Sequence, residues 1–301
     1  MTIEDLLHRL RQDLRDGGLT GSFLVRNLHT GDELGIDPDT VLPIASLAKL
    51  PLALATAERI RRGDLSGATR IRVEPGRITS PGPTGLSRFQ HPATIAVDDL
   101  LYLSTSVSDG TAADALFDLT PPDTVAGILA ELGLKGITVR HTMRELSDTP
   151  AERFSPADAH LALALAIDGG TSGRGHRVPQ LDVSSANTGT ARAFIDFLQA
   201  VWTPSTIAPQ VAERVRSLMG ANLLVQRLSP DFSSDAAAWS SKTATLLNLR
   251  HEVGVVAHDN GHAFAVAALT ESRVAASSQP AAEALMGQVA RTLRDTLRSR
   301  P

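Results

Sequence analysis

The chain contains no cysteine among its 301 residues. Disulfide bonds, thiolate nucleophiles and cysteine-ligated metals are therefore excluded, while the redox compartment stays undetermined. No apolar stretch approaches the length of a membrane-spanning helix. The first 18 residues carry four acidic side chains, where a secretion signal would be continuously apolar. Unless a leader preceded the given chain, we expect a cytoplasmic protein without a membrane partner.

The chain also lacks an excess of basic residues, because its formal net charge is -4. A nucleic-acid-binding protein usually shows a basic patch, so no nucleic-acid partner is expected. The nine histidines show no metal-ligand spacing, and no phosphate-binding glycine loop is present. We therefore expect neither a metal nor a cofactor. A length of 301 residues with 42% hydrophobic side chains fits one or two globular domains with a substantial core.

Lysine is the scarcest charged residue, with three copies (Lys49, Lys135 and Lys242) against 26 arginines. Lys49 follows Ser46 by three residues at the start of an apolar helical segment, residues 50–60, so both side chains lie on one helical face. A buried lysine can lose its proton and activate a serine hydroxyl, which an arginine cannot do. The Ser46 amide, at a helix N-terminus, could also face a developing oxyanion. The pattern predicts a nucleophile and its base; the alternative is a surface helix with Ser46 as its N-cap.

The spacing of apolar residues predicts helices in the middle of the chain and strands near both ends. Residues 1–42 and 232–301 are expected to form one antiparallel sheet with flanking helices, and residues 43–231 an inserted all-helical subdomain. This is an α/β (α+β) fold class in one structural unit, with a cleft where the two parts meet. Predicted helices span residues 3–14, 50–60, 97–119, 123–132, 155–167, 189–202, 208–219 and 282–297; predicted strands span 22–28, a short run ending at 36, 249–258 and 262–270; residues 64–94 are predicted to be a loop.

Two further motifs join Ser46 and Lys49 along the chain. Ser108-Asp109-Gly110 lies in a helical pattern, and Lys242-Thr243-Ala244 precedes the last predicted hairpin. Ser-x-x-Lys, Ser-Asp-Asn and Lys-Thr-Gly in this order mark the penicillin-recognising serine hydrolases. Over most of its length the chain resembles the class A β-lactamase branch of that family. The resemblance implies a β-lactamase/transpeptidase-like fold and a serine hydrolase that forms an acyl-enzyme.

The resemblance also implies a catalytic role for each matching side chain. Ser46 would be the acylated nucleophile, and Lys49 would be its base. Ser108 would relay a proton to the leaving group, and the cation of Lys242 would assist it.

Further matching positions are implied to bind the substrate. Thr243 would help to hold a substrate carboxylate. Arg250, in the strand after Lys242, is a second candidate anchor because a guanidinium can bind a carboxylate bidentately. The backbone N–H groups of Ser46 and Thr245 would form the oxyanion hole.

Two motif positions depart from the family pattern. The family has an asparagine that bonds the substrate amide where this chain has Gly110, so efficient hydrolysis of acylamino β-lactams is not expected. Ala244 adds a methyl group beside the substrate and should narrow the cleft. Ser-Asp-Gly also resembles antibiotic-biosynthesis relatives of the family, including the β-lactamase-like enzyme of clavulanic-acid biosynthesis.

Class A enzymes deacylate with a loop glutamate in an Arg-x-Glu-x-x-Leu-Asn setting. The corresponding stretch, residues 140–149, offers Glu145 without that setting. Glu145 is therefore either the water-activating base or a solvated loop glutamate. Residues 145–187 contain a loop insertion relative to a typical class A enzyme, which is either a lid beside the cleft or surface decoration.

Several functions fit these residues. Within the family the candidates are an esterase or amidase, or a weak β-lactam hydrolase, in specialised (antibiotic) metabolism; a genuine β-lactamase; and a D-Ala-D-Ala peptidase. Each would act on a small molecule, which we expect to bear a carboxylate. A non-hydrolysing ligand-binding pseudoenzyme is the alternative from another class, and the retention of both Lys49 and Lys242 argues against it. The oligomeric state stays undetermined.

Overall fold

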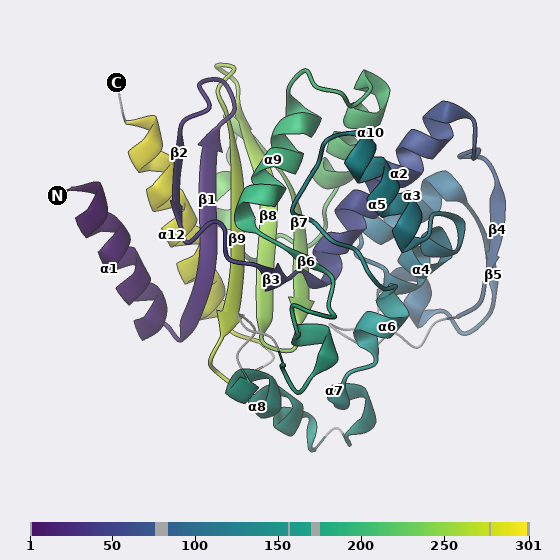
Figure 1. Cartoon of the computed structure of the whole chain (residues 1–301), viewed down its shortest axis with the longest axis horizontal. Coiled ribbons are helices and arrows are strands. Elements are labelled where there is room, and N and C mark those ends of the chain that lie inside the picture. The colour runs from purple at the N-terminus through teal and green to yellow at the C-terminus, as the bar shows by residue number, and fades with distance from the viewer. Residues whose placement is uncertain (1, 76–83, 156, 170–174, 277, 300–301) are drawn as a thin grey trace.

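The computed structural model describes residues 2–75, 84–155, 157–169, 175–276 and 278–299. No helix within these ranges is both long and apolar enough to cross a membrane. In chain order the elements are α1 (Ile3–Asp16), β1 (Leu19–Asn27), β2 (Glu33–Ile36), β3 (Leu42–Pro43), the 3-10 helix η1 (Ala45–Ala48), α2 (Lys49–Arg62), β4 (Arg70–Val73), η2 (Gly85–Arg88), β5 (Ala93–Ala96), α3 (Val97–Thr105), α4 (Gly110–Leu119), α5 (Pro122–Glu131), α6 (Met143–Ser147), α7 (Pro150–Arg153), α8 (Ala159–Gly169), η3 (Pro179–Leu181), β6 (Thr188–Gly189), α9 (Ala191–Trp202), α10 (Pro209–Gly220), α11 (Ser229–Phe232), β7 (Ala237–Leu246), β8 (Leu249–His258), β9 (Ala263–Ser272) and α12 (Pro280–Arg298) (Figure 1).

Both ends of the chain contribute to one five-stranded antiparallel sheet with the order β2-β1-β9-β8-β7 (Figure 1). The first strand, β1, pairs with the last, β9, so that Leu24 lies opposite Ala267. At the far side, β7 pairs with β8 and places Lys242 opposite Val253. The predicted fold class, an antiparallel sheet with flanking helices, is therefore confirmed. β7 is the terminal strand, and its outer edge pairs with no other strand of this sheet.

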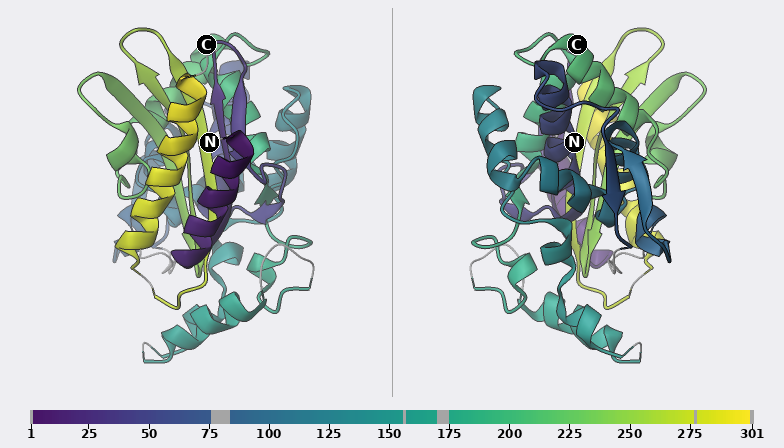
Figure 2. Two further views of the ribbon diagram at one scale, coloured as in Figure 1. Left: turned by 90° about the vertical axis from the view of Figure 1, so that its left-hand side faces the viewer. Right: turned by 90° about the vertical axis from the view of Figure 1, so that its right-hand side faces the viewer.

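Alternate residues of the sheet face two separate apolar layers. Phe23 and Val25 of β1 belong to the layer that α1 and α12 cover, whereas Leu24 belongs to the opposite layer, which α9 and α10 help to cover. Figure 2 shows α1 and α12 side by side across one face of the sheet. Leu6 and Leu10, one turn apart, form the buried face of α1. Burial of each side chain of this size contributes about 1.5–3 kcal/mol to the free energy of folding, so these contacts hold α1 against the sheet.

The single helix predicted over residues 97–119 is wrong at its centre. The structure divides it into α3 and α4 at residues 106–109, where Ser108 has a φ of 62°. A left-handed residue cannot continue a right-handed helix. The Asp109 side chain then caps α4 by accepting the N–H groups of Thr111 and Ala112. Ser108 therefore lies in a break between two helices instead of on a helical face.

Two other expectations need correction. Residues 64–94, predicted to be a loop, contain β4 and the start of β5, and these strands pair so that Ile71 lies opposite Ile95. The alternating Arg and apolar residues of β4 are a strand signal that the neighbouring Gly and Pro residues obscured. The helix predicted from residue 155 begins at Ala159, and Ser155 instead donates a hydrogen bond to the Asp158 carboxylate at 2.7 Å. Residue 156, the second residue of the predicted helix 155–167, lies outside the described residues.

Gly254 of β8 allows β7 to pack closely against β8, because it has no side chain. A Cβ at this position would lie 2.5 Å from the Ser240 carbonyl oxygen and 2.7 Å from the Trp239 ring. We expect Gly254→Ala to lower the free energy of unfolding by about 1–3 kcal/mol, because the backbone of β7 must move. Gly127→Ala on α5 is the control, since an added Cβ there meets nothing within 4 Å. It should be neutral or stabilising by about 0.5–1 kcal/mol. Urea unfolding measures both, and equal effects of the two substitutions would contradict this account.

Candidate active site

Ser46 lies in the short 3-10 helix η1, between β3 and the start of α2. It does not act as the side-chain N-cap of α2, because that position is Ala48 and no capping side chain bonds there. The preceding residue, Ala45, has a φ of 45°, a strained conformation for a residue with a side chain. Such strain persists only where surrounding contacts fix it, and η1 contacts β7. Ser46 itself is 6% exposed.

Lys49 is the first residue of α2 and is buried. Its Nζ donates a hydrogen bond to the Ser108 carbonyl oxygen at 2.7 Å and lies 3.5 Å from Ser108 Oγ. Burial lowers the pKa of Lys49 to about 8, against the opposing attraction of Asp109 and Asp114. A lysine with this pKa is partly neutral near pH 7 and can accept a proton.

Lys242 approaches the same serine from β7. Its Nζ donates to Ser108 Oγ at 2.8 Å and to the Thr243 carbonyl oxygen at 2.7 Å. Burial, followed by the positive charges of Lys49 and Arg227, lowers the pKa of Lys242 well below its ordinary value. The structure thus brings three predicted site residues together, with the Ser108 hydroxyl between two buried lysines.

The break that holds Ser108 is fixed by its neighbour Asp109, which is completely buried. In addition to capping α4, the Asp109 carboxylate accepts hydrogen bonds from the Leu86 N–H and, at 2.9 Å, from Ser87 Oγ. Asp109 therefore ties the α3–α4 junction to η2. Gly110, which follows it, is the buried first residue of α4 and offers no side-chain donor.

The predicted substrate-binding residues of β7 have different surroundings. The Oγ1 atom of Thr243 is buried without a hydrogen-bond partner, although a hydroxyl in this position usually has one. Ala244 is buried, whereas Thr245 is partly exposed. A role of Thr243 in holding a substrate carboxylate therefore stays a prediction.

Arg250, the other predicted anchor, is folded back onto the backbone. Its guanidinium donates to the carbonyl oxygens of Leu247 at 2.6 Å, Leu249 at 2.8 Å and Ala276 at 3.3 Å. Burial, followed by the charge of Arg227, lowers the pKa of Arg250 to about 10. These contacts stabilise the β7–β8 turn, and a role in substrate binding stays a prediction.

Arg227, which no sequence motif marks, is 2% exposed and lies just before α11. Its guanidinium contacts the backbone and side chains of β7 and β8, including the Ala244 carbonyl oxygen at 2.8 Å. Nothing in the local sequence distinguishes this residue from 25 other arginines. The run Arg250-His251-Glu252 was a usable signal, because three ionisable residues in succession within a strand pattern require buried partners.

Glu145, the predicted deacylation base, is exposed. Its carboxylate accepts hydrogen bonds from the Thr142 N–H at 2.8 Å and Thr142 Oγ1 at 3.0 Å, and so forms a capping box at the start of α6. The buried residues of α6 are instead Met143, Leu146 and Ser147, none of which carries a carboxylate. The structure therefore assigns the Glu145 carboxylate to a contact within its own helix.

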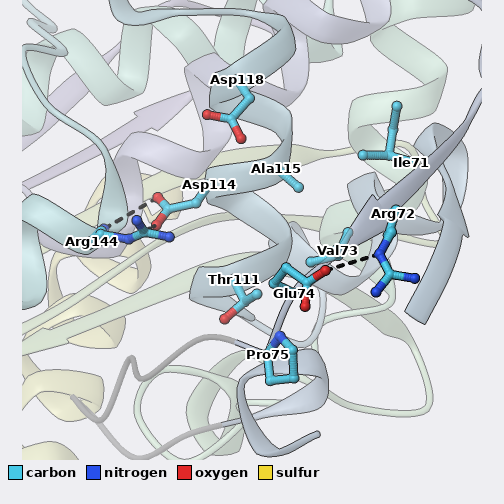
Figure 3. A pocket seen from close by; sticks show the side chains of 10 residues that line it. All are labelled: Ile71, Arg72, Val73, Glu74, Pro75, Thr111, Asp114, Ala115, Asp118 and Arg144. Carbon is cyan, nitrogen blue, oxygen red and sulfur yellow. Dashed lines mark hydrogen bonds and ion pairs between the residues drawn. The ribbon is translucent and has the colours of Figure 1, made fainter. Parts of the chain in front are cut away.

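A different carboxylate, Asp114 of α4, interacts electrostatically with Lys49. It accepts hydrogen bonds from the Met143 N–H at 2.7 Å and the Arg144 N–H at 3.3 Å, and thereby holds α6 against α4. Figure 3 shows Asp114 and Arg144 facing each other at a cavity of about 540 Å³ lined by β4, α4 and α6. Burial raises the pKa of Asp114 to about 6. Among the described residues no three His, Asp or Glu side chains are grouped as metal ligands would be.

Comparison with known proteins assigns this arrangement to a family. The model described as the β-lactamase enzyme family matches residues 4–297, and the chain therefore belongs to that family. Its fold is the class A β-lactamase-like fold of the penicillin-recognising serine hydrolases.

Individual relatives cover nearly the whole chain. The β-lactamase regulatory protein BlaB of Streptomyces cacaoi is 69% identical over 306 residues, which is 98% of this chain and 98% of that protein. A β-lactamase from Sphaerobacter thermophilus superposes with a TM-score of 0.75 at 20% identity, covering 98% of both chains. A mutant of PBP-A, whose structure is an acyl-enzyme complex with penicillin G, superposes with a TM-score of 0.74 at 19% identity, covering 99% of this chain and 97% of that one.

The pKa of Lys49 leads to a prediction for the rate of modification of Ser46. Lys49 acts as a base only when neutral, so labelling of Ser46 by a fluorophosphonate should rise with pH up to about 8 and then level off. Lys49→Arg should abolish this rise, because an arginine keeps its proton. Stopped-time labelling followed by mass spectrometry measures the rate. A limb near 10.5, the ordinary lysine pKa, would show that Lys49 is not the base.

The raised pKa of Asp114 leads to a second prediction. A carboxyl whose pKa is raised to about 6 in the folded protein costs stability at pH 7, and the cost disappears as pH falls below the ordinary value of 3.8. Asp114→Asn keeps the acceptor for the Met143 N–H and should raise the free energy of unfolding at pH 7 by on the order of 1–2 kcal/mol. It should also move the pH-dependent rise in Ser46 labelling below pH 8, because the negative charge that raises the pKa of Lys49 is lost. Asp118→Asn, in the same cavity but exposed, is the control and should change neither quantity. An unchanged limb in Asp114→Asn would contradict the coupling.

Proposed function

We propose that this protein is a serine hydrolase that forms an acyl-enzyme at Ser46. The observation that carries the proposal is the position of Ser108 Oγ between the Nζ atoms of Lys49 and Lys242, at the junction of α3 and α4, two helices that both contact α2. Lys49, with its pKa lowered to about 8, takes the Ser46 proton as Ser46 Oγ bonds to the substrate carbonyl. The C–N or C–O bond then breaks as Ser108 passes its hydroxyl proton to the departing nitrogen or oxygen and regains a proton from protonated Lys49, whose Nζ lies 3.5 Å from Ser108 Oγ. Lys242 donates a hydrogen bond to Ser108 Oγ and so stabilises the negative charge that develops there.

The binding residues favour a substrate that bears a carboxylate. The partnerless Thr243 hydroxyl and the adjacent Lys242 cation supply a donor and a positive charge on one strand. Gly110 supplies no hydrogen bond to an acylamino group, so esters, simple amides and poorly turned-over β-lactams fit better than good acylamino β-lactam substrates. The Ser-Asp-Gly motif is the support for a role in specialised (antibiotic) metabolism.

Hydrolysis of the acyl-enzyme should be slow. The Glu145 carboxylate is exposed and satisfied by Thr142, and the buried side of α6 presents Met143 and Leu146. A water molecule on that side would have no carboxylate of α6 to accept its proton. This argues against a genuine β-lactamase, which must deacylate rapidly.

A second candidate function is control of β-lactamase production in response to a β-lactam. The name of the 69% identical relative, a β-lactamase regulatory protein, favours it. A persistent acyl-enzyme suits such a sensor, because the covalent state reports exposure to the compound for as long as it lasts. We place this function, like the hydrolase, in the cytoplasm. A ligand-binding protein without acylation is the remaining alternative.

Intact-protein mass spectrometry tests the proposal. The protein is incubated with benzylpenicillin, with a cephalosporin that carries a 3'-acetoxy ester and with a fluorophosphonate, and Ser46→Ala is the control. We expect at least one adduct on the unaltered protein that persists and that Ser46→Ala lacks. Substrate consumption without an adduct would show rapid deacylation and revive the β-lactamase or esterase alternative. No adduct and no consumption from all three compounds would favour the binding protein.

The location of Glu145 gives a prediction about deacylation. Glu145→Gln removes the carboxylate but keeps an acceptor for Thr142, so the decay rate of the benzylpenicillin adduct should change by less than about threefold. The mass of the adduct is followed with time after the free compound is removed. A hundredfold slower decay in Glu145→Gln would instead identify Glu145 as the base in a rearranged loop.

A further inference from the structure

The guanidinium of Arg227 makes four hydrogen bonds with β7, β8 and α12. Nη1 donates to the carbonyl oxygens of Ala244 and His251, both at 2.8 Å. Nη2 donates to Thr245 Oγ1, and Nε donates to the Glu283 carboxylate at 2.9 Å. With 2% of its surface exposed, Arg227 is among the largest fully buried side chains of the described chain. All three of its nitrogens are therefore occupied by protein atoms.

The position of Nη1 determines how one peptide of β7 is oriented. Ala244 and His251 are partners across the β7–β8 ladder, and Nη1 bonds both of their carbonyl oxygens. The Ala244 carbonyl thus points toward β8. In a planar trans peptide the N–H of the next residue, Thr245, points the opposite way. That direction is the outer edge of β7, the terminal strand of the sheet, and β7 also contacts the helix that carries Ser46.

We propose that Arg227 is a positioning residue for the oxyanion hole: it holds and polarises the Ala244–Thr245 peptide so that the Thr245 N–H faces the reacting group. This inference rests on the proposed acylation of Ser46. A cation at the carbonyl end of a peptide increases the dipole of that peptide and strengthens the N–H at its other end. The bond to Thr245 Oγ1 fixes the following residue as well.

A partly buried carboxylate and a fully buried one keep Arg227 in place. Glu283, in the first turn of α12, binds Nε. Glu252 of β8 accepts the N–H of the next residue, Leu228, at 2.8 Å and the Trp239 indole N–H at 2.9 Å. Glu283 thereby attaches Arg227 to α12, and Glu252 attaches the neighbouring Leu228 to β8 and, through Trp239, to β7. A polarising group must be rigid to be effective, and this one is.

The competing role for Arg227 is direct binding of a substrate carboxylate. Arg227, Thr245 and Arg250 line a cavity of about 500 Å³, so an anion could in principle displace Glu283. The two roles differ in which reagents depend on Arg227. A positioning residue affects every reagent whose oxygen enters the oxyanion hole, whereas an anchor affects only reagents that carry a carboxylate.

The experiment compares labelling of Ser46 by benzylpenicillin, which carries a carboxylate, with labelling by a neutral alkyl fluorophosphonate. The fluorophosphonate forms a Ser46 Oγ–P bond with loss of fluoride. In Arg227→Gln and Arg227→Lys we expect both rates to fall by a similar factor, roughly 10- to 100-fold. Arg227→Lys keeps the charge but cannot reach all the acceptors. Arg291→Gln, which removes an exposed ion pair with Asp231 at 3.2 Å, is the matched control and should leave both rates unchanged.

A loss confined to benzylpenicillin in both variants would overturn the positioning role and make Arg227 an anchor. The amide resonance of Thr245 in a 1H–15N spectrum gives a readout that does not depend on acylation. It should shift in Arg227→Lys, and an unchanged resonance would overturn the proposal even if the protein labels slowly. If the unaltered protein reacts with neither reagent at Ser46, the proposed function fails, and the resonance alone decides whether Arg227 holds this peptide.

Discussion

Two lysine side chains are buried against one serine hydroxyl, and the rest of the site depends on this contact. Removing a charge from water costs several kcal/mol unless it is paired, so burial of Lys49 and Lys242 lowers the pKa of both. The carboxylates of Asp109 and Asp114 offset this cost only in part for Lys49. A lysine held in this way can exchange a proton near neutral pH. The same burial therefore reduces stability and, under the proposed function, lets Lys49 act as a base.

The strand β8 supports both halves of this arrangement with consecutive buried side chains. On one side, Thr270 donates its N–H to His251 Nδ1 at 3.0 Å, so His251 Nε2 carries the proton and donates to the Pro43 carbonyl oxygen at 2.9 Å. Burial lowers the pKa of His251 to about 4, which keeps this neutral form at ordinary pH. His251 thus fixes the segment that leads to Ser46. On the other side, Glu252 holds the segment of Arg227. The strand β8 therefore contacts both the segment before Ser46 and the segment of Arg227, which in turn contacts β7.

The sequence predicted this fold and singled out three residues that the structure brings together, Lys49, Ser108 and Lys242, but not their supports. Local motifs identified Ser46, Lys49, Ser108 and Lys242, because short spacing and lysine scarcity are visible in one dimension. The left-handed turn at Ser108 was invisible, since a serine there has no glycine-like signature, and the helix pattern continued through it. Contacts over long sequence distances were also hidden. Arg227 reaches β7 and β8 through folding alone, and its sequence neighbourhood resembles that of any surface arginine.

Two parts of the candidate site are attached to the fold in different ways. The hydrogen bonds to Ser108 come from Lys49 of α2 and Lys242 of β7, and Asp109 ties the α3–α4 junction to η2. α6 is attached separately, through the bonds from its first N–H groups to Asp114. That carboxylate has a pKa raised to about 6 by burial, and its negative charge in turn raises the pKa of Lys49. Under the proposed function, substitutions in α6 would therefore change hydrolysis of the acyl-enzyme more than its formation.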